Sequence, residues 1–432
     1  MPGVESGDTG SKDPTSRSPA AGRLVRSYYA AARRGCRGCH DVVVGATREW
    51  AVGVVRRLGT ERVVLAAYLA FTVWVLVDPS RDTQRVWATV AAIGYAAALL
   101  GLSVGLGPRR SCLVAAVGSV VVPTALLVAR GMGQPEIRVV HSGALQLVAA
   151  GSPYLPDPSS VYDYRPYLPA LYVFGALPGG DLRLPALALL VAALAAVRFW
   201  SRRVPEGPDD QRAVLDTRLA LLVACPLVAA AVAVSGVDVP QAALTVLAIA
   251  LVSRRRYGWS AVAIGLTMAM KPTGICAAFV LTLCIYRRDG VRAALVFAAL
   301  TTVTALVAVL PVARVAPRAM WDNVVEFPSG ESLVQSPAAS PLPGVLLRLA
   351  GLPSWASLAL VLVAAVAFGV WCVVRSSPEV SWAASRIALG LCLAFLLVPY
   401  SRVGYFLVPV LVFFPFQWVA ARAPASAAPA PG

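Results

Sequence analysis

Long apolar runs recur along most of this chain, and basic residues gather at their ends. With 432 residues, 58% of them hydrophobic and only 14% charged, the chain carries more apolar surface than one water-exposed core can bury. A run of about 20 apolar residues crosses the roughly 30 Å hydrocarbon layer of a bilayer as a helix. The sequence therefore predicts an all-α, polytopic membrane protein.

About twelve apolar stretches are candidates for transmembrane helices. They lie at about 63–78, 86–106, 111–130, 182–200, 217–235, 239–253, 258–270, 273–286, 291–311, 355–374, 382–399 and 403–421. Several are shorter than a bilayer requires, notably the two runs that flank Lys271 and Pro272. Short, proline-interrupted helices are tolerated at membrane depth only where protein or water covers them, so we expect short re-entrant or interfacial helices on the outer face. We interpret 165–178 as one such segment.

The distribution of charge predicts the orientation of these spans. Threaded from an inside N-terminus, they place about 27 of the 38 Lys and Arg residues inside and about 11 outside. This bias predicts a multi-pass protein of the cell membrane with both termini cytoplasmic. Basic clusters such as 254–256 lie at span ends, where they contact lipid headgroups, so the net charge of +16 does not indicate nucleic-acid binding.

Composition divides the chain into three segments. Residues 1–60 are predicted to be a basic, largely disordered cytoplasmic arm without a visible signal peptide, 61–421 a transmembrane domain, and 422–432 a disordered tail. Within the arm, 36–40 reads Cys-Arg-Gly-Cys-His, the pattern of c-type haem attachment. Because haem attachment is expected on the outer side and this arm inside, we favour a solvated arm over haem or weak metal binding.

Two long outer loops, 131–166 and 312–342, hold the residues best suited to chemistry. Loops longer than about 12 to 15 residues without secondary structure of their own are usually functional or disordered. In the first loop, apolar residues recur at helical spacing from Val140 to Val148. This spacing predicts a short helix on the outer surface that ends at Gly151.

Glu136 and His141 would lie at the N-terminal end of this helix, where the helix dipole favours an anion. A carboxylate at the membrane boundary can act as a general base that deprotonates an acceptor hydroxyl while a sugar–phosphate bond breaks. Asp163 is a second carboxylate in the same loop. The alternative is that Glu136 is an ordinary solvated residue paired with Arg138.

Cationic groups on the outer side can stabilise a departing phosphate, and the candidates are Arg165, Lys271 and Arg402, with His141 as an auxiliary donor. Lys271 is one of only two lysines and lies between apolar runs, which makes it a candidate functional residue. A lysine that snorkels to the headgroups is the alternative. Asp238 can orient a sugar hydroxyl, pair with Lys271, or serve only as a turn former.

Tyr405 lies at the outer boundary, where an aromatic belt anchoring the helix explains a tyrosine as well as sugar binding does. Other chemistries find little support in the sequence. It holds no glycine-rich phosphate loop, no zinc-ligand spacing and only two histidines. We therefore expect neither a cofactor nor a metal site.

Several short motifs of the outer segments follow one another in a set order. An acidic start and Val-Val-His-Ser-Gly-Ala are followed by Gly-Ser-Pro-Tyr, Tyr-Arg-Pro-Tyr-Leu-Pro, Ser-Gly-Val-Asp and Met-Lys-Pro-Thr. This order resembles the integral-membrane GT-C glycosyltransferases over most of 60–420. It is similar in particular to the polyprenyl-phosphate-mannose-dependent α-mannosyltransferases of high-GC bacteria.

The resemblance implies a GT-C-like fold and an inverting, metal-independent hexosyltransferase that acts outside the membrane. The donor would be a polyprenyl-phosphate sugar, with mannose expected, and the acceptor a lipid-linked or cell-envelope glycan. In that family the first outer loop begins with an Asp taken as the catalytic base; Glu136 stands at the matching position, and Asp163 is the other catalytic candidate. Tyr154 and Tyr167 lie in the matching motifs, and Tyr405 ends the segment Arg402-Val403-Gly404-Tyr405, which also matches the family pattern; all three join the substrate-binding candidates.

Two other functions are compatible with the pattern. A carrier for a lipid-linked sugar or small anion is one, because broken helices around a midplane cation also occur in transporters. A catalytically silent scaffold for envelope assembly is the other, since Glu replaces the family's Asp. The long acidic outer loops favour the enzyme, whereas an inverted internal repeat, which is not visible by eye, would favour the carrier.

Overall fold

Helices form at every position where the sequence predicts a span. The computed structural model describes residues 59–77, 82–177, 179–201 and 209–421. In these residues it contains helices, one isolated β-bridge between Ala339 and Ser401, and no strand. The all-α prediction is thus confirmed, while the predicted arm with its haem-like motif and the predicted C-terminal tail lie outside the described residues.

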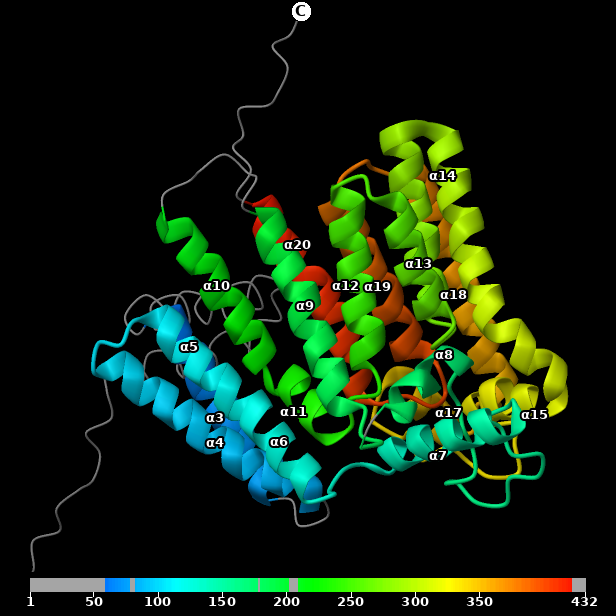
Figure 1. The fold of residues 1–432 in the computed structure, drawn as a ribbon, viewed down its shortest axis with the longest axis horizontal. Coiled ribbons are helices and arrows are strands. Elements are labelled where there is room, and N and C mark those ends of the chain that lie inside the picture. The colour runs from blue at the N-terminus through cyan, green and yellow to red at the C-terminus, as the bar shows by residue number, and fades with distance from the viewer. Residues whose placement is uncertain (1–58, 78–81, 178, 202–208, 422–432) are drawn as a thin grey trace, which may run out of the picture. The chain divides into compact units, whose positions relative to one another are not determined.

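Apart from residues 60–63, the long apolar helices belong to one compact unit that begins at Val64 (Figure 1). They are α3 (Thr60–Val77), α4 (Asp82–Ser103), α5 (Pro108–Ala116) continued by η1 (Val117–Val121) and α6 (Val122–Ala129), α9 (Arg183–Ser201), α10 (Asp209–Ala224), α11 (Pro226–Val234), α12 (Val239–Ser253), α13 (Tyr257–Met268), α14 (Gly274–Val315), α18 (Ser354–Val374), α19 (Val380–Leu397) and α20 (Leu407–Ala420). The shorter helices are α7 (Pro135–Ala150), α8 (Pro169–Tyr172), η2 (Val173–Ala176), α15 (Pro317–Trp321), η3 (Asp322–Glu326), α16 (Phe327–Ser329), α17 (Pro343–Leu349) and η4 (Val403–Phe406).

Not all of the long helices are complete spans. Among the described residues, seven are long and apolar enough to cross a membrane, or eight if α10 and α11 form one span bent by 55°. Helices α12, α13 and α14 account for part of the difference from the predicted twelve. Helix α14 covers two predicted spans, because its backbone leaves the helical conformation at Gly290 (φ 84°). Figure 1 shows that α14 turns back on itself. Helices α12 and α13, with 15 and 12 residues, are too short to cross the hydrocarbon layer alone.

Helix α12 lies at the centre of the helical unit. It contacts α9, α13, α14, α19 and α20. All but three of its 15 residues are buried, most of them Ala, Val, Leu and Ile. A short helix enclosed by protein on all sides forms its own backbone hydrogen bonds, and its neighbours hold it at membrane depth. This arrangement fixes the start of α12, where Asp238 lies, deep within one end of the unit.

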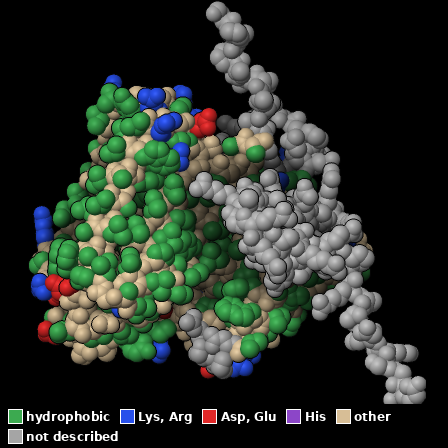
Figure 2. Space-filling view, turned by 180° about the vertical axis from the view of Figure 1, so that it is seen from behind, with side chains coloured by type: hydrophobic (Ala, Val, Ile, Leu, Met, Phe, Trp, Pro, Cys, Tyr) green, Lys and Arg blue, Asp and Glu red, His purple; other side chains and the backbone are tan. Residues whose placement is uncertain are grey.

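Apolar side chains face outward on the helices at the periphery. On α18, Trp355, Leu362 and Val363 are each exposed by about two thirds of their surface. Viewed from behind, the molecule carries hydrophobic side chains over the middle of its left part and basic side chains along the upper edge (Figure 2). A surface of this kind is suited to lipid and not to water.

Both long outer loops contain structured segments. The helix expected in the first loop is α7, which ends where predicted: Gly151 adopts the left-handed conformation (φ 72°) and its N–H donates to the carbonyl of Leu147. The second loop contains α15, η3 and α16, and α17 follows directly after it. The segment interpreted as re-entrant forms only α8 and η2, which together span eight residues.

Candidate active site

The break between α13 and α14 carries Lys271. The last carbonyl groups of a helix lack partners within it. At the end of α13, the N–H groups of Leu168 and Ala170 fill two of these positions, donating to the carbonyls of Met270 and Ala269 at 3.0 Å each. The segment that enters α8 is therefore bound directly to the broken helix. As a result, Tyr167 lies beside Lys271.

Lys271 forms an ion pair with Asp238, which stands at the N-terminal end of α12. The helix dipole favours a carboxylate at this position. The two side chains are 15% and 12% exposed. The hydroxyl of Thr273 holds α12 and the start of α14 together, because it accepts a hydrogen bond of 2.6 Å from the buried amide of Gln241. The pairing considered in the sequence is thus present, and Asp238 is more than a turn former.

Two tyrosine rings flank the ammonium group of Lys271. Its Nζ lies 5.0 Å from the ring centroid of Tyr167 and 5.4 Å from that of Tyr405. At distances below about 6 Å the negative face of a ring attracts a cation. Tyr405 therefore contacts a charge inside the protein, in addition to any role as an interfacial anchor. The lysine is held in a cage of one carboxylate and two rings.

A second ion pair joins the first outer loop to the segment between α19 and η4. Glu136, in the first turn of α7, accepts a hydrogen bond from Arg402 through its Oε1 atom. The alternative pairing of Glu136 with Arg138 is not found in the described part of the chain. Within the described residues, Oε2 of Glu136 is buried and has no hydrogen-bond partner. The carboxylate thus keeps one acceptor unused.

The second outer loop holds Arg402 in place. Ser340 donates its N–H to the carbonyl of Ser401 at 3.0 Å, and its hydroxyl accepts the N–H of Val403 at 3.1 Å. A parallel bridge pairs Ala339 with Ser401. These contacts anchor the backbone on either side of the arginine, which positions its guanidinium against Glu136.

Tyr167 lies within electrostatic reach of both ion pairs. Burial raises the pKa of its phenol well above the ordinary value, and the negative charges of Glu136 and Asp238 raise this pKa further. Carboxylates from both pairs therefore act on one phenol. We call this group the two-pair cluster; its members are Glu136, Tyr167, Asp238, Lys271, Arg402 and Tyr405. It combines a carboxylate with a free oxygen, an ammonium and a guanidinium.

Arg165 lies apart from the two-pair cluster. Its guanidinium donates to the side-chain oxygen of Gln146 at 2.6 Å and to the carbonyl of Pro153, and the residue is only 6% exposed. Its own N–H donates to Asn323 in η3 at 2.6 Å, so that this buried arginine ties the first outer loop to the second. Burial lowers the pKa of its guanidinium. These contacts join the two loops, while the Nε atom of Arg165 is buried without a partner among the described residues.

His141, Tyr154 and Asp163 also make contacts outside the cluster. The Nδ1 atom of His141 lies 2.9 Å from the carbonyl of Gly175 and links α7 to η2. The hydroxyl of Tyr154 donates to the carbonyl of Tyr167 at 2.8 Å, so Tyr154 supports the cluster from behind. Asp163 accepts two hydrogen bonds from Ser160 and two from Ser159, as a turn-stabilising carboxylate does.

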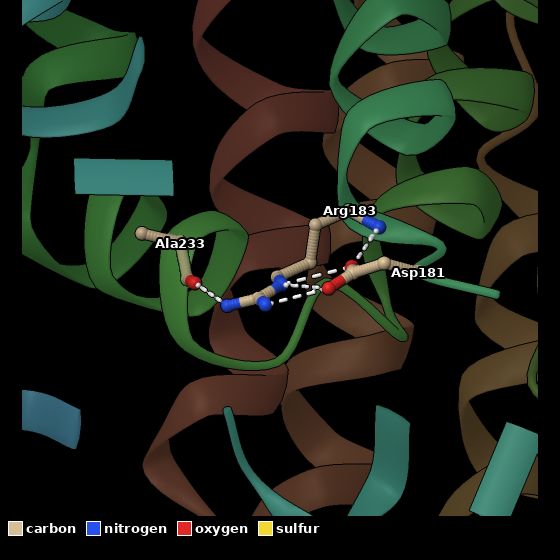
Figure 3. A network of polar contacts seen from close by, with 3 residues as sticks. All are labelled: Asp181, Arg183 and Ala233. Atoms are coloured by element: carbon tan, nitrogen blue, oxygen red, sulfur yellow. Dashed lines mark hydrogen bonds and ion pairs between the residues drawn. The ribbon is translucent and has the colours of Figure 1, made fainter. Parts of the chain in front are cut away.

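A buried arginine that the sequence analysis did not single out lies near the start of α12. Arg183 is 1% exposed and grips Asp181 with Nε and Nη2, while Nη1 donates to the carbonyl of Ala233 at 2.7 Å (Figure 3). Gly236 (φ 74°) lies against it, where an added Cβ would come within 2.9 Å of the arginine Cγ. This network fixes the turn that leads to Asp238. The spacing of Asp181 and Arg183 after Gly179 and Gly180 was the only local signal, and it is a weak one.

Comparison with known proteins gives one match. A family model described as glycosyltransferase family 87 matches residues 166–399, which is more than half of the chain. The matched region contains Tyr167, Asp238 and Lys271, while Glu136 lies before it and Arg402 shortly after it. Searches of curated proteins and of solved structures find no match.

Proposed function

The chain belongs to glycosyltransferase family 87, a membrane family of the GT-C type, and on this premise we propose that it transfers mannose from a polyprenyl-phosphate donor. The acceptor is a lipid-linked or cell-envelope glycan, and the reaction takes place on the outer side of the cell membrane. One observation carries the proposal: two cations and two carboxylates from distant parts of the chain meet around Tyr167 at one end of the helical unit.

Glu136 is the general base in this proposal. Its free Oε2 takes the proton from the acceptor hydroxyl as the hydroxyl oxygen forms its bond to C1 of the sugar. The bond from C1 to the donor phosphate breaks at the same time, so the configuration at C1 inverts and polyprenyl phosphate leaves with the bonding electrons. Arg402 holds the other carboxylate oxygen and thereby fixes the direction in which the free one points.

The departing phosphate is stabilised by Lys271 and Arg402. Arg402 uses only its Nη1 atom on Glu136 in the described part of the chain, which leaves the rest of its guanidinium for a phosphate oxygen. The ammonium of Lys271 is fixed by Asp238 and two rings before the donor arrives. Cations that need no reorganisation contribute most to stabilising charge that develops in the transition state.

The remaining predicted residues support these groups from the outer loops. We propose that Arg165, Tyr154 and His141 keep the first loop, with Tyr167 and Glu136, folded against the helical unit. Asp238 orients Lys271 and is available to a sugar hydroxyl. Asp163 is proposed only as a turn residue, since its carboxylate is occupied by two serines.

The test is an assay in sealed vesicles with radiolabelled polyprenyl-phosphate mannose. The proposal predicts that label moves to an acceptor glycan and that unlabelled polyprenyl phosphate accumulates in equal amount. Movement of the intact lipid sugar across the bilayer without cleavage would indicate a carrier and overturn the proposal. Neither cleavage nor movement, with a panel of donors that differ in the sugar, would indicate a silent scaffold.

A further inference from the structure

An arginine in the first half of α19, a helix long enough to cross a membrane, has no acidic partner among the described residues. Arg386 is the seventh residue of this helix, and about 16 Å of helix separate it from the other end, near the two-pair cluster. In the described part of the chain it makes no ion pair and no hydrogen bond, and its Nε atom is buried without a partner. An ionisable residue in a span is a functional-site hypothesis by default.

Two other arginines at span ends have carboxylates beside them. Arg198 pairs with Asp216, and Arg255 pairs with Asp289 at 3.1 Å. Arg386 instead lies over aromatic rings, 3.9 Å from the centroid of Trp371 on α18 and 6.0 Å from that of Trp382 on α19. The rings attract the cation, but they offer no hydrogen-bond acceptor to the N–H groups, which point outward in the plane of the guanidinium.

A second unsatisfied donor lies next to Arg386. The indole Nε1 of Trp382 is buried and has no acceptor among the described residues. Trp382 precedes Arg386 by one helical turn, so both donors lie on the same side of α19. Two neighbouring donors without an acceptor are costly in a protein interior unless an external group supplies oxygens. A phosphate offers several such oxygens and carries the opposite charge.

The surroundings of these donors are open to lipid. Trp371 is 38% exposed, and Val370 and Val374 on the same helix are 60% and 72% exposed. Arg375 follows Trp371 by one turn and is exposed at the end of α18. The nearby carboxylate of Glu379 accepts a hydrogen bond from Ser381 at the start of α19. Cationic groups at the headgroup level above an apolar helix surface suit a phospholipid, with acyl chains on α18 and the phosphate at Arg386.

We infer that the surface between α18 and α19, at the end of the helices opposite to the two-pair cluster, binds the phosphate of an anionic phospholipid through Arg386 and Trp382. This site is separate from the proposed glycosyl transfer and does not depend on it. A headgroup with a net negative charge is required, because no carboxylate among the described residues neutralises the positive charge of Arg386. A zwitterionic lipid would bring its own cation to the same place.

Lipid retention by the purified full-length protein tests this inference. We would titrate the protein in detergent with phosphatidylglycerol and with phosphatidylcholine and count bound lipids by native mass spectrometry. Wild type is expected to bind phosphatidylglycerol about tenfold more tightly, and Arg386→Gln is expected to remove this preference. The matched control is Arg218→Gln, because Arg218 also lies 6.0 Å from a tryptophan ring, that of Trp418. It should keep the preference.

Three results would overturn the inference. One is equal binding of the two lipids by wild type, which needs no variant and so does not depend on the folding of Arg386→Gln. Another is an unchanged preference in Arg386→Gln, or the same loss in Arg218→Gln. The third is displacement of the lipid by millimolar inorganic phosphate, which would mean a general anion site and not a lipid site.

Discussion

Replacing Lys271 by Met should destabilise the protein, because it leaves the largely buried carboxylate of Asp238 without its cationic partner. Asp238 is 12% exposed and pairs with Lys271. Two charges 4 Å apart interact by about 4 kcal/mol at an effective dielectric constant of 20, and breaking a buried pair costs about 3 to 5 kcal/mol. Because both side chains keep some exposure, we expect a loss of about 2 to 3 kcal/mol for Lys271→Met.

A second substitution separates this structural cost from any catalytic role. Asp238→Asn removes the stranded charge, so the double variant Lys271→Met/Asp238→Asn should regain at least half of the lost stability. The coupling energy expected from the cycle is about 1 to 2 kcal/mol. Unfolding in detergent, followed by tryptophan fluorescence, measures each variant. Lys271→Arg is the control that keeps the charge between the rings of Tyr167 and Tyr405.

Sugar transfer should not recover with stability. The double variant has no ammonium group for the donor phosphate, so kcat/KM for the donor is expected to fall about 100-fold, which corresponds to about 2.7 kcal/mol of transition-state stabilisation. Transfer at the wild-type rate by a stable double variant would mean that Lys271 only supports the fold. The assignment of a phosphate contact would then be wrong.

The other predictions concern single residues. Arg402→Gln should lower kcat more than donor affinity, because Glu136 loses its orientation; an unchanged kcat would remove Arg402 from the mechanism. Asp163→Asn should leave transfer unchanged. Hydrogen bonds from serines lower the pKa of Asp163 below its ordinary value of 3.8. The stability that these bonds give to the protein is fully present above pH 3.8 and is lost as the pH falls through the lowered pKa. Unfolding of wild type and of Asp163→Asn, measured as a function of pH, checks this direction. Gly175→Ala should reduce folded yield, because its Cβ would lie 2.5 Å from a carbonyl oxygen of α7, whereas Gly258→Ala, with only one atom at 4.0 Å, should not.

The sequence predicts the helices well because their signal is local. Apolar runs of the right length, and Gly151 at the end of α7, identify positions that the structure confirms. Hydropathy cannot separate a short helix enclosed by protein, such as α12, from one that crosses lipid. That distinction depends on which neighbours surround it, and these come from distant parts of the chain.

The site is predicted in part for the same reason. The lone Lys271 and the turn at Asp238 stand out locally, and their pairing could be anticipated. The pairing of Glu136 with Arg402 joins residues 266 positions apart, and no spacing rule connects them. Arg165 and His141 have the chemistry expected of a site, but their contacts are with neighbouring backbone and amide groups. Only the packing of the loops decides between these roles.

The central claim is that Glu136 takes the proton from the acceptor. Its most direct test is the single-turnover rate of label transfer by Glu136→Gln, which keeps the size of the side chain and removes its basicity. We expect this rate to fall about 100- to 10,000-fold while the donor still binds, and Glu136→Asp to keep part of the activity. Transfer by Glu136→Gln at the wild-type rate would contradict the account.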